Sequence, residues 1–240
     1  MILDPLLLLR AYAIGVFPMS DDRDADEIYW VEPKQRAILP LDGFHLSRSL
    51  AKTVRTERFR VTVNADFRGV VQLCAEAAAD RPTTWINHAI EASYAQLHRL
   101  GFAHSVECWE GDALVGGLYG VALGRAFFGE SMASRRTDAS KVALAWLVAR
   151  MRLAGMTLLD CQFMTDHLRS LGAIEISQRD YRALLDVALS GISLADESAL
   201  LSAGPGPEAA SAFAPDLSPT LTVSGPVSGH FIAQLLTQTS

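Results

Sequence analysis

The chain has 240 residues, of which 50% are hydrophobic and 20% charged, and its formal net charge is −6 at pH 7. This length allows one large domain or two small ones around a full apolar core, as in an ordinary soluble globular protein. No stretch approaches the roughly 20 apolar residues of a membrane helix, and the N-terminus lacks the basic region and cleavage site of a signal peptide, so we expect a cytoplasmic protein with no membrane partner.

Residues 1–58 are predicted to form a small N-terminal α/β unit. Asp4 and Pro5 precede a run of leucines, which is typical of a capped helix start, and Gly15 marks the end of that helix. The other elements expected here are short strands at 28–30 and 36–39, a turn at 40–43 and a helix at 46–54.

Residues 59–195 show a cleaner pattern of helices and strands. A strand at 59–63 leads to a helix capped by Asn64 or Asp66, and a second helix follows Trp85. Three antiparallel strands joined by glycine-bearing turns are then expected at 104–109, 113–122 and 126–130. The remaining elements are a helix at 138–153, a strand at 156–161, and helices at 166–171 and 179–189.

This order of elements indicates an α/β (α+β) fold, with an acetyltransferase-like (GNAT-like) mixed sheet and flanking helices after the N-terminal unit. Such a fold does not by itself give a function. Alanine, serine, proline and glycine dominate the end of the chain, so residues 196–240 are predicted to be a flexible tail without a functional role.

The positions of the cysteines, histidines and basic residues indicate which ligands the protein could bind. The three cysteines are far apart and the histidines are not set at ligand spacing, so we predict no disulfide framework and no metal. The acidic net charge argues against a nucleic-acid partner, but two basic blocks weaken that objection. Solvated helix faces explain such blocks at least as often as phosphate binding does. The candidate phosphate contacts in these blocks are Arg48, Lys52, Arg55, Arg135, Arg136 and Lys141.

Polar side chains follow two of the predicted strands. Glu130 ends the strand at 126–130, and Asp160 and Gln162, two residues apart on the next strand, point to the same face. Two acids and a glutamine around one cleft suit transfer between an amine and a carbonyl, because such a site must accept a proton and stabilise an oxyanion. From spacing alone, a core-facing strand end with incidental polar caps is favoured over catalysis.

Other classes of protein have to be weighed against these residues. An acyl-CoA N-acyltransferase would place a glycine-rich turn before the helix at 138–153, where backbone N–H groups could hold a pyrophosphate. The turn at 134–139 contains no glycine and carries Asp138, which argues against coenzyme A. A non-catalytic module that binds tRNA or basic N-termini remains an alternative, because it could keep the same polar residues.

Several separated segments resemble the leucyl/phenylalanyl-tRNA–protein transferase family, in one order along most of the chain from about residue 6 to 185. The segments that carry the resemblance are Gly15-Val16-Phe17-Pro18, Tyr29-Trp30, Thr84-Trp85-Ile86, 103–109, 115–121, Phe128-Gly129-Glu130-Ser131-Met132, Asp138-Ala139-Ser140-Lys141, Asp160-Cys161-Gln162 and Leu171-Gly172-Ala173.

The resemblance implies an enzyme that moves leucine or phenylalanine, and methionine less well, from aminoacyl-tRNA. The acceptor is the α-amine of proteins that begin with arginine or lysine, which marks them for degradation by the N-end rule. No DNA partner, metal or coenzyme is implied. The missing pyrophosphate turn agrees with this activity, because the tRNA ester already supplies the driving force and the enzyme mainly juxtaposes two reactants.

The resemblance also assigns roles to residues. Gln162, oriented by Asp160, would assist loss of the proton from the attacking amine or stabilise the oxyanion, and Glu130 would position the donor's amino group or the cationic acceptor. Trp85 is similar to the family tryptophan that holds the terminal adenosine of the tRNA. Candidates for the apolar pocket of the donor side chain, which could equally be plain core, are Leu118, Phe127, Met151 and Leu159.

Overall fold

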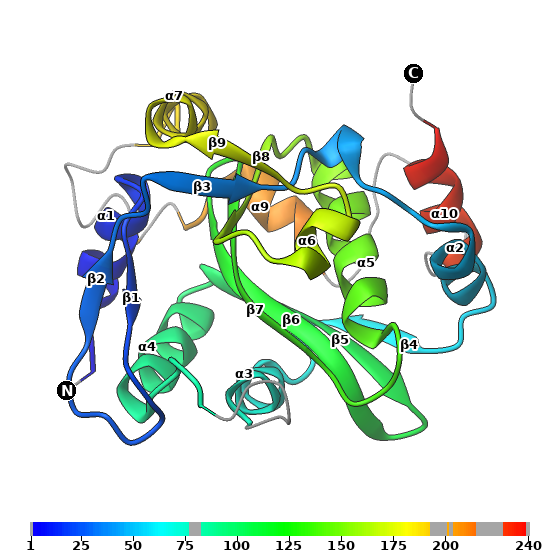
Figure 1. Ribbon diagram of the computed structural model, residues 1–240, viewed down its shortest axis with the longest axis horizontal. Coiled ribbons are helices and arrows are strands. Elements are labelled where there is room, and N and C mark those ends of the chain that lie inside the picture. The colour runs from blue at the N-terminus through cyan, green and yellow to red at the C-terminus, as the bar shows by residue number, and fades with distance from the viewer. Residues whose placement is uncertain (1, 77–82, 193–200, 202–203, 215–227, 239–240) are drawn as a thin grey trace.

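The computed structural model describes residues 2–76, 83–192, 201, 204–214 and 228–238 (Figure 1). Among these residues, seven strands form one mixed sheet in the order β4-β5-β6-β7-β8-β3-β9, and β1 and β2 pair separately. The strands are β1 (Phe17–Met19), β2 (Tyr29–Val31), β3 (Gln35–Ile38), β4 (Arg60–Val63), β5 (Ala103–Glu110), β6 (Ala113–Leu123), β7 (Ala126–Ser134), β8 (Leu158–Gln162) and β9 (Ile174–Ser177).

Helices cover both faces of the large sheet (Figure 1). Side chains of α2, α5, α9 and α10 pack with one face, and those of α1, α3, α4 and α7 pack with the other. The helices described are α1 (Pro5–Ala13), α2 (Arg48–Arg55), α3 (Phe67–Ala75), α4 (His88–Arg99), α5 (Ala139–Ala154), α6 (Asp166–Ser170), α7 (Gln178–Ala188), α9 (Pro207–Ala212) and α10 (Gly229–Thr237), with a 3-10 turn at Leu41–Gly43.

Local signals set the ends of several helices as predicted. Asp4 caps α1 by accepting hydrogen bonds from the backbone N–H groups of Leu6 (2.9 Å) and Leu7 (3.0 Å). Asp66 caps α3 in the same way, and Asn87 caps α4. These side chains satisfy N–H groups that the first turn of a helix leaves without a partner.

The N-terminal residues do not form a sheet of their own. β3 lies inside the large sheet, antiparallel to β8 on one side and to β9 on the other. The separate unit predicted for residues 1–58 is therefore wrong for β3, since Ala37 and Ile38 are buried among strands from the far end of the chain. Strand β9, which completes this part of the sheet, was absent from the predicted elements.

The prediction of a flexible tail at 196–240 is wrong where the structure describes that segment. Helix α9 packs on α5, and α10 packs on α2 and α5 (Figure 1). Buried apolar side chains hold both helices, among them Phe213, Ile232 and Leu236. The composition hid these contacts because few apolar residues stand among many small ones. The rest of the predicted tail lies outside the described residues.

Candidate active site

Strands β7 and β8 run parallel and then separate. Their ladder ends where Phe128 pairs with Asp160, but β7 continues to Ser134 along β6. The predicted strand end at Glu130 is therefore wrong, because the long strand β6 supplies partners beyond it. Tyr119 opposes Ser131 and Gly120 opposes Gly129, so Glu130 is the extra residue of a β-bulge. The bulge lies where the two parallel strands part.

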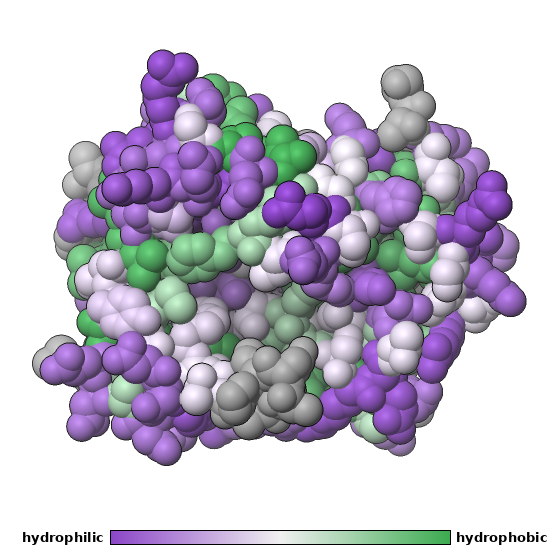
Figure 2. Space-filling view, in the orientation of Figure 1, coloured by the Kyte–Doolittle hydropathy of each residue, from purple (hydrophilic) through white to green (hydrophobic). Residues whose placement is uncertain are grey.

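A cavity of about 340 Å³ opens beside this separation. Its walls come from β7, the end of β8, α5, α6, the β1 strand and the loop before α4. Figure 2 shows a hollow in the middle of the viewed face, with apolar and pale residues between polar rims. Glu130 and Gln162 both line the cavity, in mainly apolar surroundings that include Leu118, Leu144 and Leu159. The site therefore suits a small apolar side chain attached to a reactive polar group.

Glu130 is a buried carboxylate held by hydrogen bonds from Tyr94 and Gln162. The Tyr94 hydroxyl donates to its Oε2 at 2.7 Å, and the Gln162 amide Nε2 donates to its Oε1 at 3.1 Å. Burial raises the pKa of Glu130 to about 7, while the hydroxyl groups of Tyr94 and of Tyr12 behind it act in the opposite direction. This side chain therefore changes its charge near neutral pH.

Gln162 ends β8 in a left-handed backbone conformation, with φ of 56°. Such a φ is uncommon for a residue with a side chain and recurs at functional sites. Asp160 Oδ1 accepts a hydrogen bond from the backbone N–H of Gln162 at 2.9 Å. Asp160 therefore contacts Gln162 through the backbone, whereas the side-chain amide of Gln162 donates to Glu130.

Asp160 belongs to a buried ion pair behind the cavity. Arg36 donates from Nε to Oδ1 of Asp160 at 2.9 Å and from Nη2 to Oδ2 at 2.6 Å, and the Tyr181 hydroxyl donates to Oδ2 at 2.8 Å. Arg36 is 1% exposed and Asp160 0%. Burial acts to lower the pKa of Arg36, but the attraction of Asp160 outweighs it and the pKa is raised. Arg36 therefore stays positively charged beside Asp160.

The predicted apolar contacts divide into two groups. Trp85, Leu118 and Leu159 line the cavity. The structure places Phe127 and Met151 in the core instead, where both are fully buried. Phe127 points to the α5 face of the sheet and stacks on Phe213, with ring centroids 5.2 Å apart. Strand alternation separates it from the face that carries Phe128.

The predicted phosphate contacts also divide. Arg135 pairs with Glu76, Arg136 with Glu110 at 3.0 Å, and Lys141 with Asp138 at 3.3 Å. Arg48, Lys52 and Arg55 are exposed on α2, and within the described part of the chain none of them makes an ion pair. Of the two basic blocks, the one on α2 is therefore the more available for contacts with phosphate.

Sequence reasoning missed four residues that support the site. Arg36, Tyr12, Tyr94 and Tyr181 hold Asp160 and Glu130 from segments far away in the chain. Arginine and tyrosine among apolar neighbours were a weak signal, since both need polar partners when buried. The residues next to them in the sequence do not indicate that their partners are Asp160 and Glu130.

Comparison with known families gives the reaction class. A family model described as leucyl/phenylalanyl-tRNA protein transferase matches residues 38–186, and the model for its N-terminal domain matches residues 1–34. The chain belongs to the leucyl/phenylalanyl-tRNA–protein transferase family. It is therefore an enzyme, an aminoacyltransferase, and the resemblance seen in the sequence is confirmed.

Curated relatives in this transferase family cover the chain closely. The leucyl/phenylalanyl-tRNA–protein transferase of Rhizorhabdus wittichii is 63% identical over 99% of this chain and 99% of its own. That of Zymomonas mobilis is 64% identical over 78% of this chain and 70% of its own. The structure of L-PGS from Bacillus licheniformis aligns over 67% of this chain and 53% of its own at 13% identity, with a TM-score of 0.38, too low to support a common fold.

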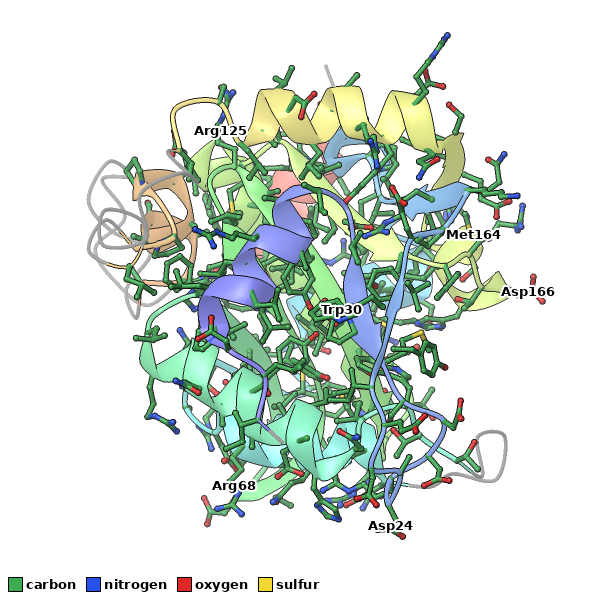
Figure 3. All side chains as sticks on the ribbon, turned by 90° about the vertical axis from the view of Figure 1, so that its left-hand side faces the viewer. Asp24, Trp30, Arg68, Arg125, Met164 and Asp166 are labelled. Carbon is green, nitrogen blue, oxygen red and sulfur yellow. The ribbon has the colours of Figure 1, made fainter. Side chains whose placement is uncertain are left out.

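Among its described residues, this transferase shows neither a metal-binding cluster nor a membrane-spanning helix. No group of three or more His, Cys, Asp or Glu side chains is placed to hold a metal ion in the described part of the chain. Among the same residues, no helix has the length and apolar character needed to cross a bilayer. Asp166 lies between Thr165 and His167, which line the cavity, but its own side chain projects from α6 away from the molecule (Figure 3).

Proposed function

We propose that this enzyme transfers leucine or phenylalanine, and methionine less well, from aminoacyl-tRNA to the α-amine of proteins that begin with arginine or lysine. The product would enter degradation by the N-end rule in the cytoplasm. The observation that carries the proposal is one apolar cavity in which Glu130 and Gln162 are hydrogen-bonded to each other. An apolar side chain and a reacting amine can be bound there together.

The chemistry requires little beyond orientation. The ester of aminoacyl-tRNA is already activated, and an N-terminal amine with a pKa of about 7.7–8.0 is partly neutral at cellular pH. In the described residues no group donates to Gln162 Oε1, so this oxygen can accept a hydrogen bond from the attacking amine. The negative charge of Glu130 attracts a cationic amine. Asp160 acts indirectly, by holding the backbone of Gln162.

We further propose an acetyltransferase-like sheet that has no use for coenzyme A or a metal. The separation of β7 from β8 beside a β-bulge supports the first part. The second part is supported by the turn before α5, which lacks glycine and places Asp138 at the N-cap without a capping bond from its side chain. A carboxylate at that position would repel a pyrophosphate.

Transfer of a labelled amino acid tests the function. The protein is incubated with labelled leucyl-tRNA and with peptides that begin with Arg, Lys, Asp or Ala. Label is expected on the Arg and Lys peptides only. Tight binding of the tRNA without transfer would favour a non-catalytic adaptor, and acylation from acetyl-CoA would favour an acyl-CoA N-acyltransferase.

Substitutions at the two ends of the cavity should have different kinetic effects. Gln162→Ala is expected to lower kcat about 10- to 100-fold with little change in KM for the tRNA, because Gln162 contacts the reacting amine. Trp85→Ala is expected mainly to raise that KM, because a lost stacking contact costs about 1–3 kcal/mol of binding. Equal effects of both substitutions on kcat and KM would contradict these roles.

The α2 block should contribute to the salt dependence of tRNA binding. The double substitution Arg48→Glu and Lys52→Glu is expected to flatten the slope of log Kd against log salt concentration by about one unit per lost phosphate contact. Arg179→Glu on α7 is the control outside this block, since the Arg179 side chain is 93% exposed. If the double substitution left the slope unchanged, α2 would not contact the tRNA phosphates and its basic residues would simply form a solvated helix face.

A further inference from the structure

A chain of hydroxyl groups lies behind Glu130 that the proposed reaction does not use. Tyr12 of α1 and Tyr94 of α4 are fully buried, and their hydroxyl groups are hydrogen-bonded to each other. Tyr94 then donates to Oε2 of Glu130 at 2.7 Å. One oxygen of the carboxylate is therefore held by Tyr94, which Tyr12 holds in turn, while the other oxygen accepts from Gln162.

Glu130 is a buried acid that no ion pair neutralises within the described residues. The nearby cation, Arg36, is bonded through two nitrogens to Asp160. Glu130 is 9% exposed and lines the cavity, so it can reach a bound substrate. Its described polar contacts come from neutral groups, which fix a carboxylate in place without replacing its charge.

We propose that Glu130 is the proton carrier of aminoacyl transfer and that Tyr94 and Tyr12 are positioning residues that hold it. This inference rests on the proposed function and adds a role to the same site. Glu130 lies beside the Gln162 amide, at the point where β7 and β8 separate, so an amine bound to Gln162 lies next to the carboxylate.

The step balances without any further reactant. The neutral α-amine attacks the ester carbonyl carbon and the N–C bond forms. Glu130 takes one proton from the nitrogen, which has become positively charged. The bond from carbon to the ribose oxygen then breaks, and the leaving oxygen takes that proton from Glu130. The carboxylate is regenerated, and one proton has moved from amine to ribose hydroxyl.

The groups that set the charge of Glu130 come from several elements. Burial has the largest effect and raises the pKa of Glu130, and the negative charge of Asp160 on β8 raises it further. Tyr94, which donates to Glu130, Tyr12 behind it, and Arg36 of β3 lower the pKa. Removing the Tyr94 hydroxyl therefore raises the pKa of Glu130. The base form would then be reached only at higher pH, so the rise of the rate with pH should move upward.

One other base lines the cavity. His167 of α6 has a buried Nε2 atom that meets no partner in the described part of the chain. Burial first, and Lys141 second, lower the pKa of His167, so it is neutral at pH 7. His167→Gln therefore belongs in the test, because it removes the alternative proton carrier and keeps a polar side chain.

The test measures kcat against pH for full-length wild type and variants, with one leucyl-tRNA and one Arg peptide. Glu130→Gln is expected to lower kcat about 100-fold. Tyr94→Phe should keep much of the activity and move the rising limb of the kcat–pH profile to higher pH. Tyr12→Phe should move this limb by a smaller amount. Ser93→Ala removes a neighbouring buried hydroxyl on α4 that bonds to Ala89 instead, and should leave the limb in place.

The outcomes separate this inference from the proposed function. Wild-type transfer with near-normal Glu130→Gln activity would overturn the inference and leave the function intact. The inference would also be overturned if Tyr94→Phe lowered kcat equally at every pH. It would be overturned as well if the rise of kcat with pH disappeared only in His167→Gln. Absence of transfer by the wild type would instead overturn the function. Glu130→Asp, which keeps the carboxylate, should retain the limb even if Glu130→Gln fails to fold.

Discussion

Replacing Arg36 by methionine is expected to lower the free energy of unfolding by about 3–5 kcal/mol, because it leaves the buried carboxylate of Asp160 without its cation. Arg36 also donates from Nη1 to the Gly15 carbonyl at 2.8 Å and lies between the rings of Phe17 and Tyr181. It joins the N-terminal segment, β8 and α7. Urea denaturation of the variant and the wild type measures the loss.

The matched control for Arg36 is Arg182→Met. Arg182 pairs with Glu32, but the two side chains are 55% and 39% exposed. Exposed pairs contribute only about 0–1 kcal/mol. A loss at Arg36 as small as that at Arg182 would contradict the structural role given to the buried pair. The double variant with Asp160→Asn should lose less than Arg36→Met alone, since the Asp160 charge is then not left buried without its cation.

Phe213→Ala is expected to cost about 3–5 kcal/mol of unfolding free energy, the usual range for deleting a buried phenylalanine. Phe213 stacks on His104 with ring centroids 4.1 Å apart and on Phe127 at 5.2 Å. Arg150, also buried, donates from Nε to the carbonyl of Ala212 at 2.6 Å and to that of Ala214. The segment after α9 therefore completes the core on the α5 face of the sheet.

Leu201→Ala is the control for Phe213, since Leu201 lies in the same C-terminal region and is 37% exposed. Exposed substitutions usually change stability by no more than about 0.5 kcal/mol. A flexible, dispensable tail would give small losses for both variants in the same denaturation experiment. A core element gives a large loss for Phe213 alone.

Short-range signals explain the parts of the fold that the sequence predicted well. The cap at Asp4 and the turns at Gly111 and Gly124 depend on neighbours within a few residues, and both glycines adopt positive φ, of 61° and 58°. The meander β5-β6-β7 follows from such turns. Glu130 and Gln162 were expected to lie close together because their strands were predicted to be neighbours, and they do meet, although Glu130 lies inside β7 and only Gln162 ends its strand.

The features of the fold and site that the sequence did not predict depend on contacts between residues far apart in the chain. Nothing near Gln35 shows that β3 enters the sheet between β8 and β9, or that Arg36 meets Asp160, 124 residues later in the chain. The Tyr12 and Tyr94 hydroxyls reach Glu130 only after three elements have packed together. Burial of Phe213 likewise depends on a surface formed by residues far earlier in the chain.

The position of β3 has a consequence for biosynthesis. An early segment of the chain forms its sheet pairs with β8 and β9, so these pairs cannot form until about three quarters of the protein has left the ribosome. Closing a loop of that length is entropically costly and slow compared with local helix formation. Asp160 acquires its partner, and Gln162 its fixed backbone, in that same late event. A nascent chain therefore has no competent catalytic centre until β3 meets β8 and β9.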